Sequence, residues 1–263
     1  MKTVGFLGAG NMGGALARAA AAGGKCRILV ADKDAVKAKA ISVRTGGSSV
    51  DSVTLAKESD IIFIGVKPNV IKCVVEEIRD KVKNEALIVC MAAAVDIATV
   101  SEYFGRDLPI IRIMPNTPVA VSEGLILYTP NKQAEGYCDE LLSVMEKAGT
   151  FDRIDERFMD AAACISGCGP AFAYMFIEAL ADGGVACGLP RDKAMLYAAR
   201  MLKGSAEMAL NSGKHPGELK DAVCSPGGTT IDGVHRLEKA AFRATVSDAV
   251  IAAYDKTLAM KSK

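Results

Sequence analysis

A glycine-rich turn near the start of the chain restricts its possible folds more than any other feature of the sequence. The apolar residues 3–7 are long enough for a buried strand. Gly8, Gly10 and Gly13 follow at the spacing Gly-x-Gly-x-x-Gly, before an alanine-rich run at residues 15–22. In a dinucleotide-binding turn the first glycine makes the tight turn, the second lets a pyrophosphate reach the backbone, and the third lets helix pack on strand. The order strand, turn, helix therefore predicts a Rossmann-type domain.

Ala9, Asn11 and Met12 complete the predicted pyrophosphate-binding turn. A second expected strand, at residues 27–31, ends at Asp32, where an acidic residue binds the ribose 2′-hydroxyl and argues for NAD. Lys33 follows directly and would pair with the 2′-phosphate of NADP, unless it is an ordinary exposed lysine. These two residues leave the choice of cofactor open.

Strands and helices alternate in the first part of the chain. We expect strands at residues 48–50, 60–66, 86–90, 109–114 and 125–128, and helices at residues 70–82, 98–104 and 134–148. Ligands of open α/β sheets lie beyond the carboxyl ends of the strands, where this chain has small residues and hydrogen-bond donors. The cofactor-binding residues predicted there are Val66, Lys67, Pro68, Ala92, Ala93 and Asn116. A solvated lysine and an Asx-turn asparagine remain alternatives for Lys67 and Asn116.

The pattern changes near residue 157, where strand signals end and helical stretches begin. Residues 172–185 carry charge only at Glu178 and Asp182, and a helix that is apolar on nearly all sides is buried. We expect a second subunit to cover it, with the first domain as the alternative. The sequence therefore predicts an α/β dinucleotide-binding domain at residues 1–156 and an all-α substrate-binding and dimerisation domain at residues 157–263.

Composition narrows the range of partners. The formal net charge is +1 and there is no basic block, so we expect no nucleic-acid partner. The apolar run at residues 86–95 is too short to span a bilayer, so we expect no membrane partner. The first residues lack the pattern of a signal peptide, which favours the cytoplasm. Eight scattered cysteines and two histidines offer little to a metal, so we predict reduced thiols and no metal site.

A loop of small and hydroxyl-bearing residues, Ser225-Pro226-Gly227-Gly228-Thr229-Thr230, leads directly into a helical pattern. Its paired glycines let a ligand approach the backbone, and Thr229 or Thr230 can cap the helix that follows. Free N–H groups at a helix start attract a carboxylate or phosphate. Asp232 would repel such an anion unless it points away as a capping-box acid. Neither His215 nor His235 is expected to be a general acid.

Three blocks of the chain closely resemble pyrroline-5-carboxylate reductases, and the resemblance extends over essentially the whole chain. The blocks are residues 167–174, residues 179–185 with 188–191, and residues 221–231 with Gly233, Val234, Leu237 and Glu238. The resemblance implies an oxidoreductase that transfers hydride from NAD(P)H to the cyclic imine of 1-pyrroline-5-carboxylate, giving L-proline in the last step of proline biosynthesis. It also implies a preference for NADP(H), with NAD(H) accepted by many members. The expected assembly is an intertwined homodimer, which family members commonly build into rings of dimers.

The resemblance also assigns roles within the site. Thr230 is the hydroxyl that would contact the imine nitrogen, in a substrate site formed with Ser225, Gly227, Gly228 and Thr229, and Glu156 would lie near the substrate. Two residues depart from the family's pattern. Ser52 stands near the adenine ribose where many relatives have asparagine, and Ala94 stands where many have glycine; both bear on cofactor affinity and preference.

Two other classes share parts of this pattern. A β-hydroxyacid dehydrogenase or related NADP reductase would need a helical lysine followed by asparagine one turn later, but Tyr197 and Glu207 follow Lys193 and Lys203 at that spacing. A nucleotide-sensing or pyridoxal-phosphate-binding protein would not need both an intact glycine turn and an intact hydroxyl loop. We therefore expect a reductase that works by positioning and electrostatics and leaves the hydride chemistry to its cofactor.

Overall fold

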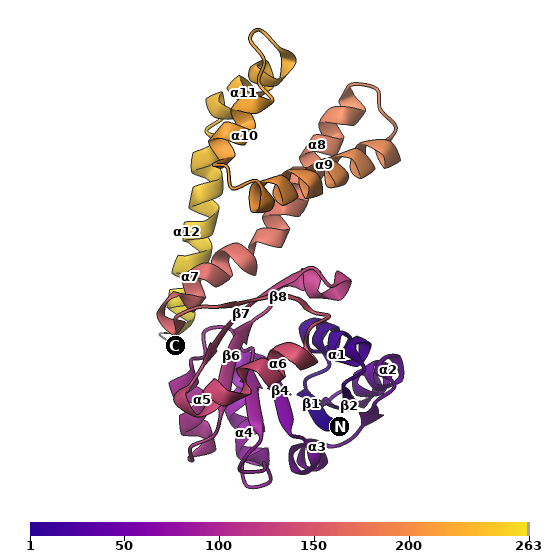
Figure 1. Cartoon of the computed structure of the whole chain (residues 1–263), viewed down its shortest axis with the longest axis vertical. Coiled ribbons are helices and arrows are strands. Elements are labelled where there is room, and N and C mark those ends of the chain that lie inside the picture. The colour runs from indigo at the N-terminus through magenta and orange to yellow at the C-terminus, as the bar shows by residue number, and fades with distance from the viewer. Residues whose placement is uncertain (262–263) are drawn as a thin grey trace. The chain divides into compact units, whose positions relative to one another are not determined.

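The computed structural model describes residues 1–261, which divide into two compact units (Figure 1). Unit 1 comprises residues 1–167 and the described residues from 253 to 261, and unit 2 comprises residues 168–252. Residues 157–167 and 253–261 therefore fall in unit 1, whereas the sequence pattern places the domain boundary after residue 156.

Unit 1 is built on one sheet with the strand order β3-β2-β1-β4-β5-β6-β7-β8. The strands are β1 (Lys2–Leu7), β2 (Cys26–Ala31), β3 (Ser48–Ser49), β4 (Ile61–Ile64), β5 (Leu87–Cys90), β6 (Ile110–Met114), β7 (Gly124–Pro130) and β8 (Gly149–Arg153). Strands β1 to β6 are parallel, whereas β7 is antiparallel to β6. The strand order reverses at β1 and β4, which is where open α/β sheets bind their ligands.

Helices cover both faces of this sheet. The core on one face contains side chains of α1 (Asn11–Gly23), α2 (Ala35–Thr45) and α6 (Cys138–Val144), and the core on the other contains those of α3 (Ser52–Glu58), α4 (Ile71–Ile78) and α5 (Ile97–Phe104). Alternate residues of β4 contribute to opposite cores: Phe63 stacks on Phe6, with ring centroids 4.7 Å apart, and Ile62 and Ile64 face the other side. This two-sided burial explains the nearly continuous apolar run of β4.

The strands expected from the sequence are all present, but some helices differ from expectation. The helix expected at residues 70–82 is a 3-10 turn, η1 (Pro68–Val70), followed by α4, which ends at Ile78. The helix expected at residues 134–148 is η3 (Lys132–Tyr137) followed by the short α6. Strand β8 and helices α2 and α3 were not predicted. β8 is an edge strand, and its charged residues Asp152 and Arg153 are exposed, so it carries no apolar pattern.

Unit 2 is all-helical, as the sequence predicts. It contains α8 (Gly169–Ala186), α9 (Arg191–Asn211), α10 (Pro216–Ala222), α11 (Thr229–Lys239) and the greater part of α12 (Phe242–Lys261). α8 and α9 lie side by side as a helical pair (Figure 1). In the single chain, large apolar side chains of this unit stay exposed, among them Tyr174, Met175, Tyr197, Met208, Leu210 and Val223. An exposed apolar surface of this kind marks an interaction site.

One helical stretch is long and apolar enough to cross a membrane, by length and composition alone. It spans Glu156–Ala186, with a mean hydropathy of 1.4, and 11% of the scored window is buried. This stretch is longer than the apolar run at residues 86–95, on which the expectation of no membrane partner was based. Its uncharged part, residues 161–177, belongs to α7 (Glu156–Ser166) and α8.

Candidate active site

The three glycines of the first turn occupy three different environments. Gly8 has a φ of +104°, and a Cβ there would lie 2.6 Å from the Gly65 carbonyl oxygen. A Cβ on Gly13 would lie 2.1 Å from the Gly8 carbonyl oxygen. Gly10 has an ordinary φ of −69°, and no protein atom lies within 4 Å of the position of its Cβ. Packing within the protein therefore requires glycine at positions 8 and 13. At Gly10 the protein itself leaves open space, as expected where a ligand approaches the backbone.

The start of α1 offers unpaired donors beside this space. Gly10 is the N-cap, no side chain caps the helix, and its first turn carries no acidic residue. Four other helices of unit 1 are capped by aspartates, namely Asp34, Asp51, Asp96 and Asp155. The first N–H groups of a helix have no intrahelical partner and attract anions. The turn and helix start thus fit the pyrophosphate of a nicotinamide dinucleotide.

Of the residues predicted for the adenosine end, Asp32 contacts this turn. Asp32 directly follows β2, and its Oδ2 accepts the Ala9 N–H at 2.7 Å while its Oδ1 accepts the Asp34 N–H at 2.9 Å. Lys33 is exposed, and Ser52 is the first residue of α3. The glycine turn and the end of β2 are therefore joined through one carboxylate.

The residues predicted at the strand ends lie at the carboxyl edge of the sheet. Val66, Lys67 and Pro68 lead from β4 into η1, and Lys67 is exposed. Ala92 and Ala93 follow β5; Ala92 is buried and Ala93 is exposed. Ala94 has a φ of +60°, a left-handed conformation that is unfavourable for a residue with a Cβ. A glycine at this position would adopt this conformation without strain.

Ala94→Gly is expected to raise the free energy of unfolding by about 0.5–1 kcal/mol, because relief of strain outweighs the added freedom of the unfolded chain. Urea denaturation of unit 1 would measure the change. Ala93→Gly is the matched control, since Ala93 is not among the non-glycine residues of positive φ, and it should lower stability slightly. Equal changes in the two variants would show that the Ala94 backbone is not strained.

A buried ion cluster attaches α7 to the sheet. Arg112 on β6 is 1% exposed, and it donates to Glu156 Oε1 at 3.3 Å and to Asp160 Oδ1 at 2.6 Å. Glu156 Oε1 also accepts the N–H of Ile97 at 2.9 Å, at the start of α5. The neighbouring Cys90 is shielded from water, and this burial raises the pKa of its thiol to about 11, so the thiol stays neutral. The first turn of α7 is thus fixed to β6 and α5 by charge-assisted bonds.

Sequence reasoning missed this cluster, although one signal was present. Arg112 is the charged residue inside the apolar strand at residues 109–114, and a buried charge requires a partner. The partners lie 44 and 48 residues further along the chain, so no local pattern identifies them. Glu156 was predicted to lie near the substrate, and this contact stays a prediction. Its bond to Arg112 gives Glu156 a structural role.

Asn116 fastens the other end of α7. Its Nδ2 donates to the Ser166 carbonyl oxygen at 3.0 Å, and its Oδ1 accepts the Leu125 N–H at 2.9 Å. The Asn116 side chain is buried. Neither the predicted contact with the cofactor nor the alternative, an Asx turn, implied this burial. A hydrogen bond from Asn116 to the cofactor stays a prediction, and would have to use the remaining N–H.

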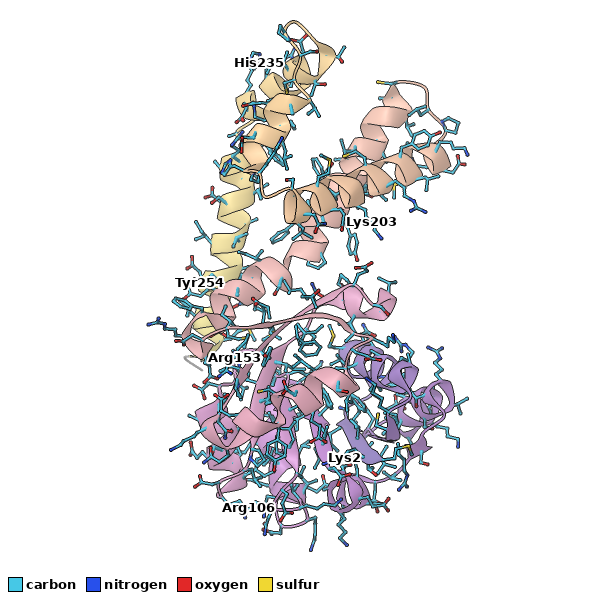
Figure 2. The ribbon with its side chains drawn as sticks, viewed as in Figure 1. Lys2, Arg106, Arg153, Lys203, His235 and Tyr254 are labelled. Carbon is cyan, nitrogen blue, oxygen red and sulfur yellow. The ribbon has the colours of Figure 1, made fainter. Side chains whose placement is uncertain are left out.

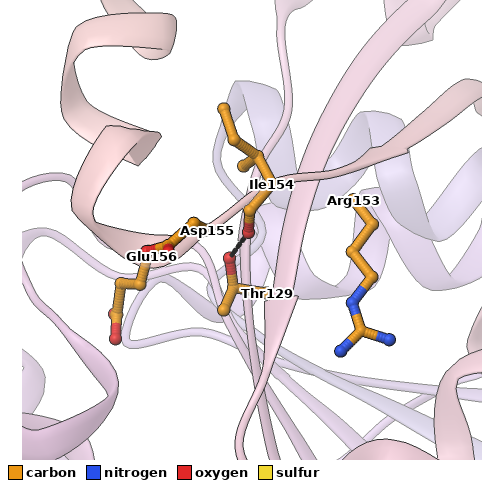
Figure 3. Close-up of a pocket in the computed structure, with 5 residues that line it drawn as sticks. All are labelled: Thr129, Arg153, Ile154, Asp155 and Glu156. Carbon is orange, nitrogen blue, oxygen red and sulfur yellow. Dashed lines mark hydrogen bonds between the residues drawn. The ribbon is translucent and has the colours of Figure 1, made fainter.

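Glu156 also borders an open depression of about 540 Å³ (Figure 3). The other lining residues are Thr129, Arg153, Ile154 and Asp155, and the Thr129 hydroxyl donates to the Ile154 carbonyl oxygen. Its charged groups already have partners: Arg153 pairs with Glu135 at 2.6 Å, and Asp155 pairs with Arg157 at 3.3 Å. The depression therefore offers no unpaired charge to a ligand.

The hydroxyl loop of unit 2 forms a tight turn that ends at a helix start. The Gly228 N–H donates to the Ser225 carbonyl oxygen at 3.0 Å, and Gly227 has a φ of +66°. A Cβ on Gly228 would lie 2.5 Å from Ser225 Oγ. Glycine is therefore favoured at position 227 by its left-handed backbone conformation, and at position 228 by the closeness of the Ser225 side chain.

Helix α11 begins at Thr229 with Gly228 as N-cap, so the prediction that Thr229 or Thr230 caps it is wrong. No side chain caps this helix, and both threonines are exposed in its first turn. Because glycine carries no side chain, a capping box cannot form, and Asp232 is not a capping-box acid. The first N–H groups and both hydroxyls are left available to a ligand.

The two histidines lie on the helices before and after this loop. His215 caps α10, where its Nδ1 accepts the Gly217 N–H at 3.0 Å. His235 is exposed on α11 (Figure 2). Within residues 1–261, no three or more His, Cys, Asp and Glu side chains are grouped so that they could hold a metal ion.

Comparisons with known proteins agree over the whole length of the chain. Residues 156–260 match the family model described as pyrroline-5-carboxylate reductase dimerisation, and residues 3–93 match the model described as NADP oxidoreductase, coenzyme F420-dependent. A pyrroline-5-carboxylate reductase of Arabidopsis thaliana is 41% identical over 256 residues, which cover 95% of this chain and 92% of that protein. The pyrroline-5-carboxylate reductase of Escherichia coli is 39% identical and covers 97% of both chains.

Solved structures give the same result. A Plasmodium falciparum pyrroline carboxylate reductase with NADP bound is 34% identical, with a TM-score of 0.90, over 99% of this chain and 98% of the other. A 1-pyrroline-5-carboxylate reductase of Streptococcus pyogenes is 28% identical, with a TM-score of 0.88, over 100% of this chain and 99% of the other. Both units of the fold, and their order along the chain, are therefore shared with these enzymes.

Proposed function

This chain belongs to the pyrroline-5-carboxylate reductase family, and we propose that its loop at residues 225–230 holds the substrate while its glycine turn holds the cofactor. It is an oxidoreductase of proline biosynthesis, which reduces the cyclic imine of 1-pyrroline-5-carboxylate to L-proline with NAD(P)H. A nicotinamide cofactor, when bound, supplies the hydride. What the chain's own residues contribute is binding, orientation and electrostatic stabilisation.

The uncapped start of α11 carries the substrate assignment. The substrate has a single carboxylate, and this helix start offers unpaired N–H groups after a turn whose glycines leave the backbone uncovered. The hydroxyls of Ser225 and Thr229 lie in the same short segment. Asp232 is exposed in the helix rather than engaged in a cap, and the carboxylate binds at the N-terminal side of it. A capped helix would have left no such donors.

Thr230 is the residue that we assign to the reacting atoms. Its hydroxyl lies one residue inside the helix start, next to the proposed carboxylate site. A protonated imine carries an N–H, and the Thr230 hydroxyl oxygen accepts it and orients the ring carbon towards the hydride donor. No strong catalytic acid is then required, because the nitrogen is protonated before hydride arrives.

On the cofactor side, the proposal assigns the pyrophosphate to the open space at Gly10 and the start of α1. The small residues Ala92 and Ala93 leave room for the nicotinamide ring at the end of β5. The remaining predicted contacts are made by Gly8, Ala9, Asn11, Met12, Gly13, Asp32, Lys33, Ser52, Val66, Lys67, Pro68 and Asn116. The presence of NADP in the related Plasmodium falciparum enzyme supports this assignment.

Thr230→Ala is expected to lower kcat/KM for pyrroline-5-carboxylate by about 10- to 100-fold, because a hydrogen bond to a charged group contributes about 1.5–3 kcal/mol. The dissociation constant of NADPH should not change, because Thr230 lies outside the glycine turn. Thr230→Ser keeps the hydroxyl and should restore most of the activity. Wild-type kinetics in the alanine variant would remove Thr230 from the site.

The chain forms a homo-oligomer through its dimerisation domain, and we propose an intertwined dimer that can assemble into a ring of dimers. The exposed apolar side chains of unit 2 support this, since one chain alone leaves them in water. Sedimentation without detergent should show a dimer or a larger assembly. A stable and active monomer would contradict the proposal.

The long apolar stretch of α7 and α8 also bears on whether the protein binds a membrane and on where it is located in the cell. The apolar stretch Glu156–Ala186 falls within the residues matched by the dimerisation model, so a second copy of the chain is the cover that we propose for it. We infer a cytoplasmic enzyme without a membrane or nucleic-acid partner. The near-neutral net charge supports the latter point.

A further inference from the structure

The carboxylate of Asp32 is fixed in place by the backbone on both sides. Oδ2 accepts the N–H of Ala9, inside the glycine turn, at 2.7 Å. Oδ1 accepts the N–H of Asp34, at the start of the loop that follows β2, at 2.9 Å. The side chain is half-buried. It cannot swing away from the turn without breaking two hydrogen bonds to the main chain, so an incoming cofactor meets a negative charge at a defined position.

In Rossmann-type domains, a carboxylate at this position faces the ribose 2′ group, which is where NADH and NADPH differ. In Rossmann-type domains the acidic residue at the end of the second strand binds the ribose 2′-hydroxyl, which NADH has and NADPH replaces with a phosphate. A fixed carboxylate accepts a hydrogen bond from the hydroxyl. It repels the phosphate, because like charges a few ångströms apart interact unfavourably, most of all when partly shielded from water.

The cations nearby are only partly available to compensate. Lys37 pairs with Asp34 at 3.5 Å, and Asp34 also accepts the N–H groups of Val36 and Lys37 as the cap of α2. Lys37 is therefore only partly engaged, by an exposed pair that water screens, and Asp34 is held by the helix that it caps. Lys33 is exposed and remains the residue next to Asp32 that can reach a 2′-phosphate.

We propose that Asp32 is the residue that sets this chain's discrimination between the two cofactors, by supporting NADH and opposing the 2′-phosphate of NADPH. The enzyme thereby works with NADH as well as with NADPH, because the difference between the dissociation constants of the two cofactors is small. This inference rests on the cofactor site proposed above, but its test does not depend on turnover of the substrate.

The test is a binding titration of purified, full-length protein with NADH and with NADPH, followed by the fluorescence of the bound cofactor. The chain has no tryptophan, so tryptophan emission does not interfere. For the wild type, the two dissociation constants should lie within about tenfold of each other. Binding of NADPH more than about a hundredfold tighter than NADH would overturn the proposal, and this result needs no variant.

Asp32→Asn keeps the size of the side chain and an oxygen for the Ala9 N–H but removes the charge. It should tighten NADPH binding by about tenfold and weaken NADH binding severalfold, so that the ratio of the two constants changes most. Asp155→Asn is the matched control, since Asp155 caps α7, asparagine also caps a helix, and the same unit of charge is lost away from the proposed cofactor site. An unchanged ratio in Asp32→Asn, or an equal shift in both variants, would overturn the assignment to Asp32. Failure of every form to bind either cofactor would instead contradict the proposed cofactor site.

Discussion

Arg112→Ala is expected to lower the free energy of unfolding by about 3–5 kcal/mol, because it leaves carboxylates without their buried cation. Arg112 is 1% exposed, and the side chain of its partner Asp160 is 8% exposed. Glu156 would keep its bond to the Ile97 N–H but lose its counter-ion. The loss should appear as a lower urea midpoint.

A surface pair provides the control for this experiment. Arg153 and Glu135 form an ion pair at 2.6 Å, with side chains 53% and 50% exposed. Arg153→Ala should cost less than about 1 kcal/mol, because water screens an exposed pair. If Arg112→Ala costs no more than Arg153→Ala, the buried cluster does not hold α7 to the sheet.

The second large effect is expected from alanine substitutions at two glycines that lie three residues apart. One substitution should lower stability, and the other should lower cofactor affinity. Gly13→Ala places a Cβ at 2.1 Å from the Gly8 carbonyl oxygen, so the backbone must move, at a cost of about 1–3 kcal/mol or more. Gly10→Ala meets no protein atom within 4 Å and should cost about 1 kcal/mol or less. Its effect should fall instead on the cofactor, with NADPH and NADH both bound at least about tenfold more weakly.

Thermal unfolding and cofactor titration of both variants separate these two outcomes. We expect Gly13→Ala to melt at a clearly lower temperature, and Gly10→Ala to melt near the wild type while losing affinity. If Gly10→Ala binds both cofactors as tightly as the wild type, the open space at Gly10 is not the pyrophosphate site.

Much of unit 1 was predictable because its signals are local. The strand, the glycine spacing and the alanine-rich helix are consecutive in the sequence, and each glycine role follows from the chemistry of a tight turn. The apolar run of β4 is equally direct, since a parallel strand covered on both faces must be apolar throughout. Strand β8 gave no such signal, because an edge strand with exposed Asp152 and Arg153 needs no apolar pattern.

What escaped prediction depends on contacts between distant parts of the chain. The partners of Arg112 and Asn116 on α7 lie 44 to 50 residues away, and only the fold brings them together. The cap of α11 was misplaced by one or two residues because glycine and threonine are both acceptable N-caps, and the choice depends on backbone geometry. The corrected position leaves the threonine hydroxyls unoccupied, which strengthens the substrate assignment.

The proposed substrate site is tested most directly by comparing 1-pyrroline-5-carboxylate with 1-pyrroline, the same cyclic imine without its carboxylate. Both would be assayed with the wild-type enzyme and saturating NADPH, and then with NADH. If the start of α11 binds the carboxylate, kcat/KM for the carboxylated imine should be at least about a hundredfold higher, and L-proline should be the product. Equal kcat/KM for the two imines, or no proline from the first, would contradict the account.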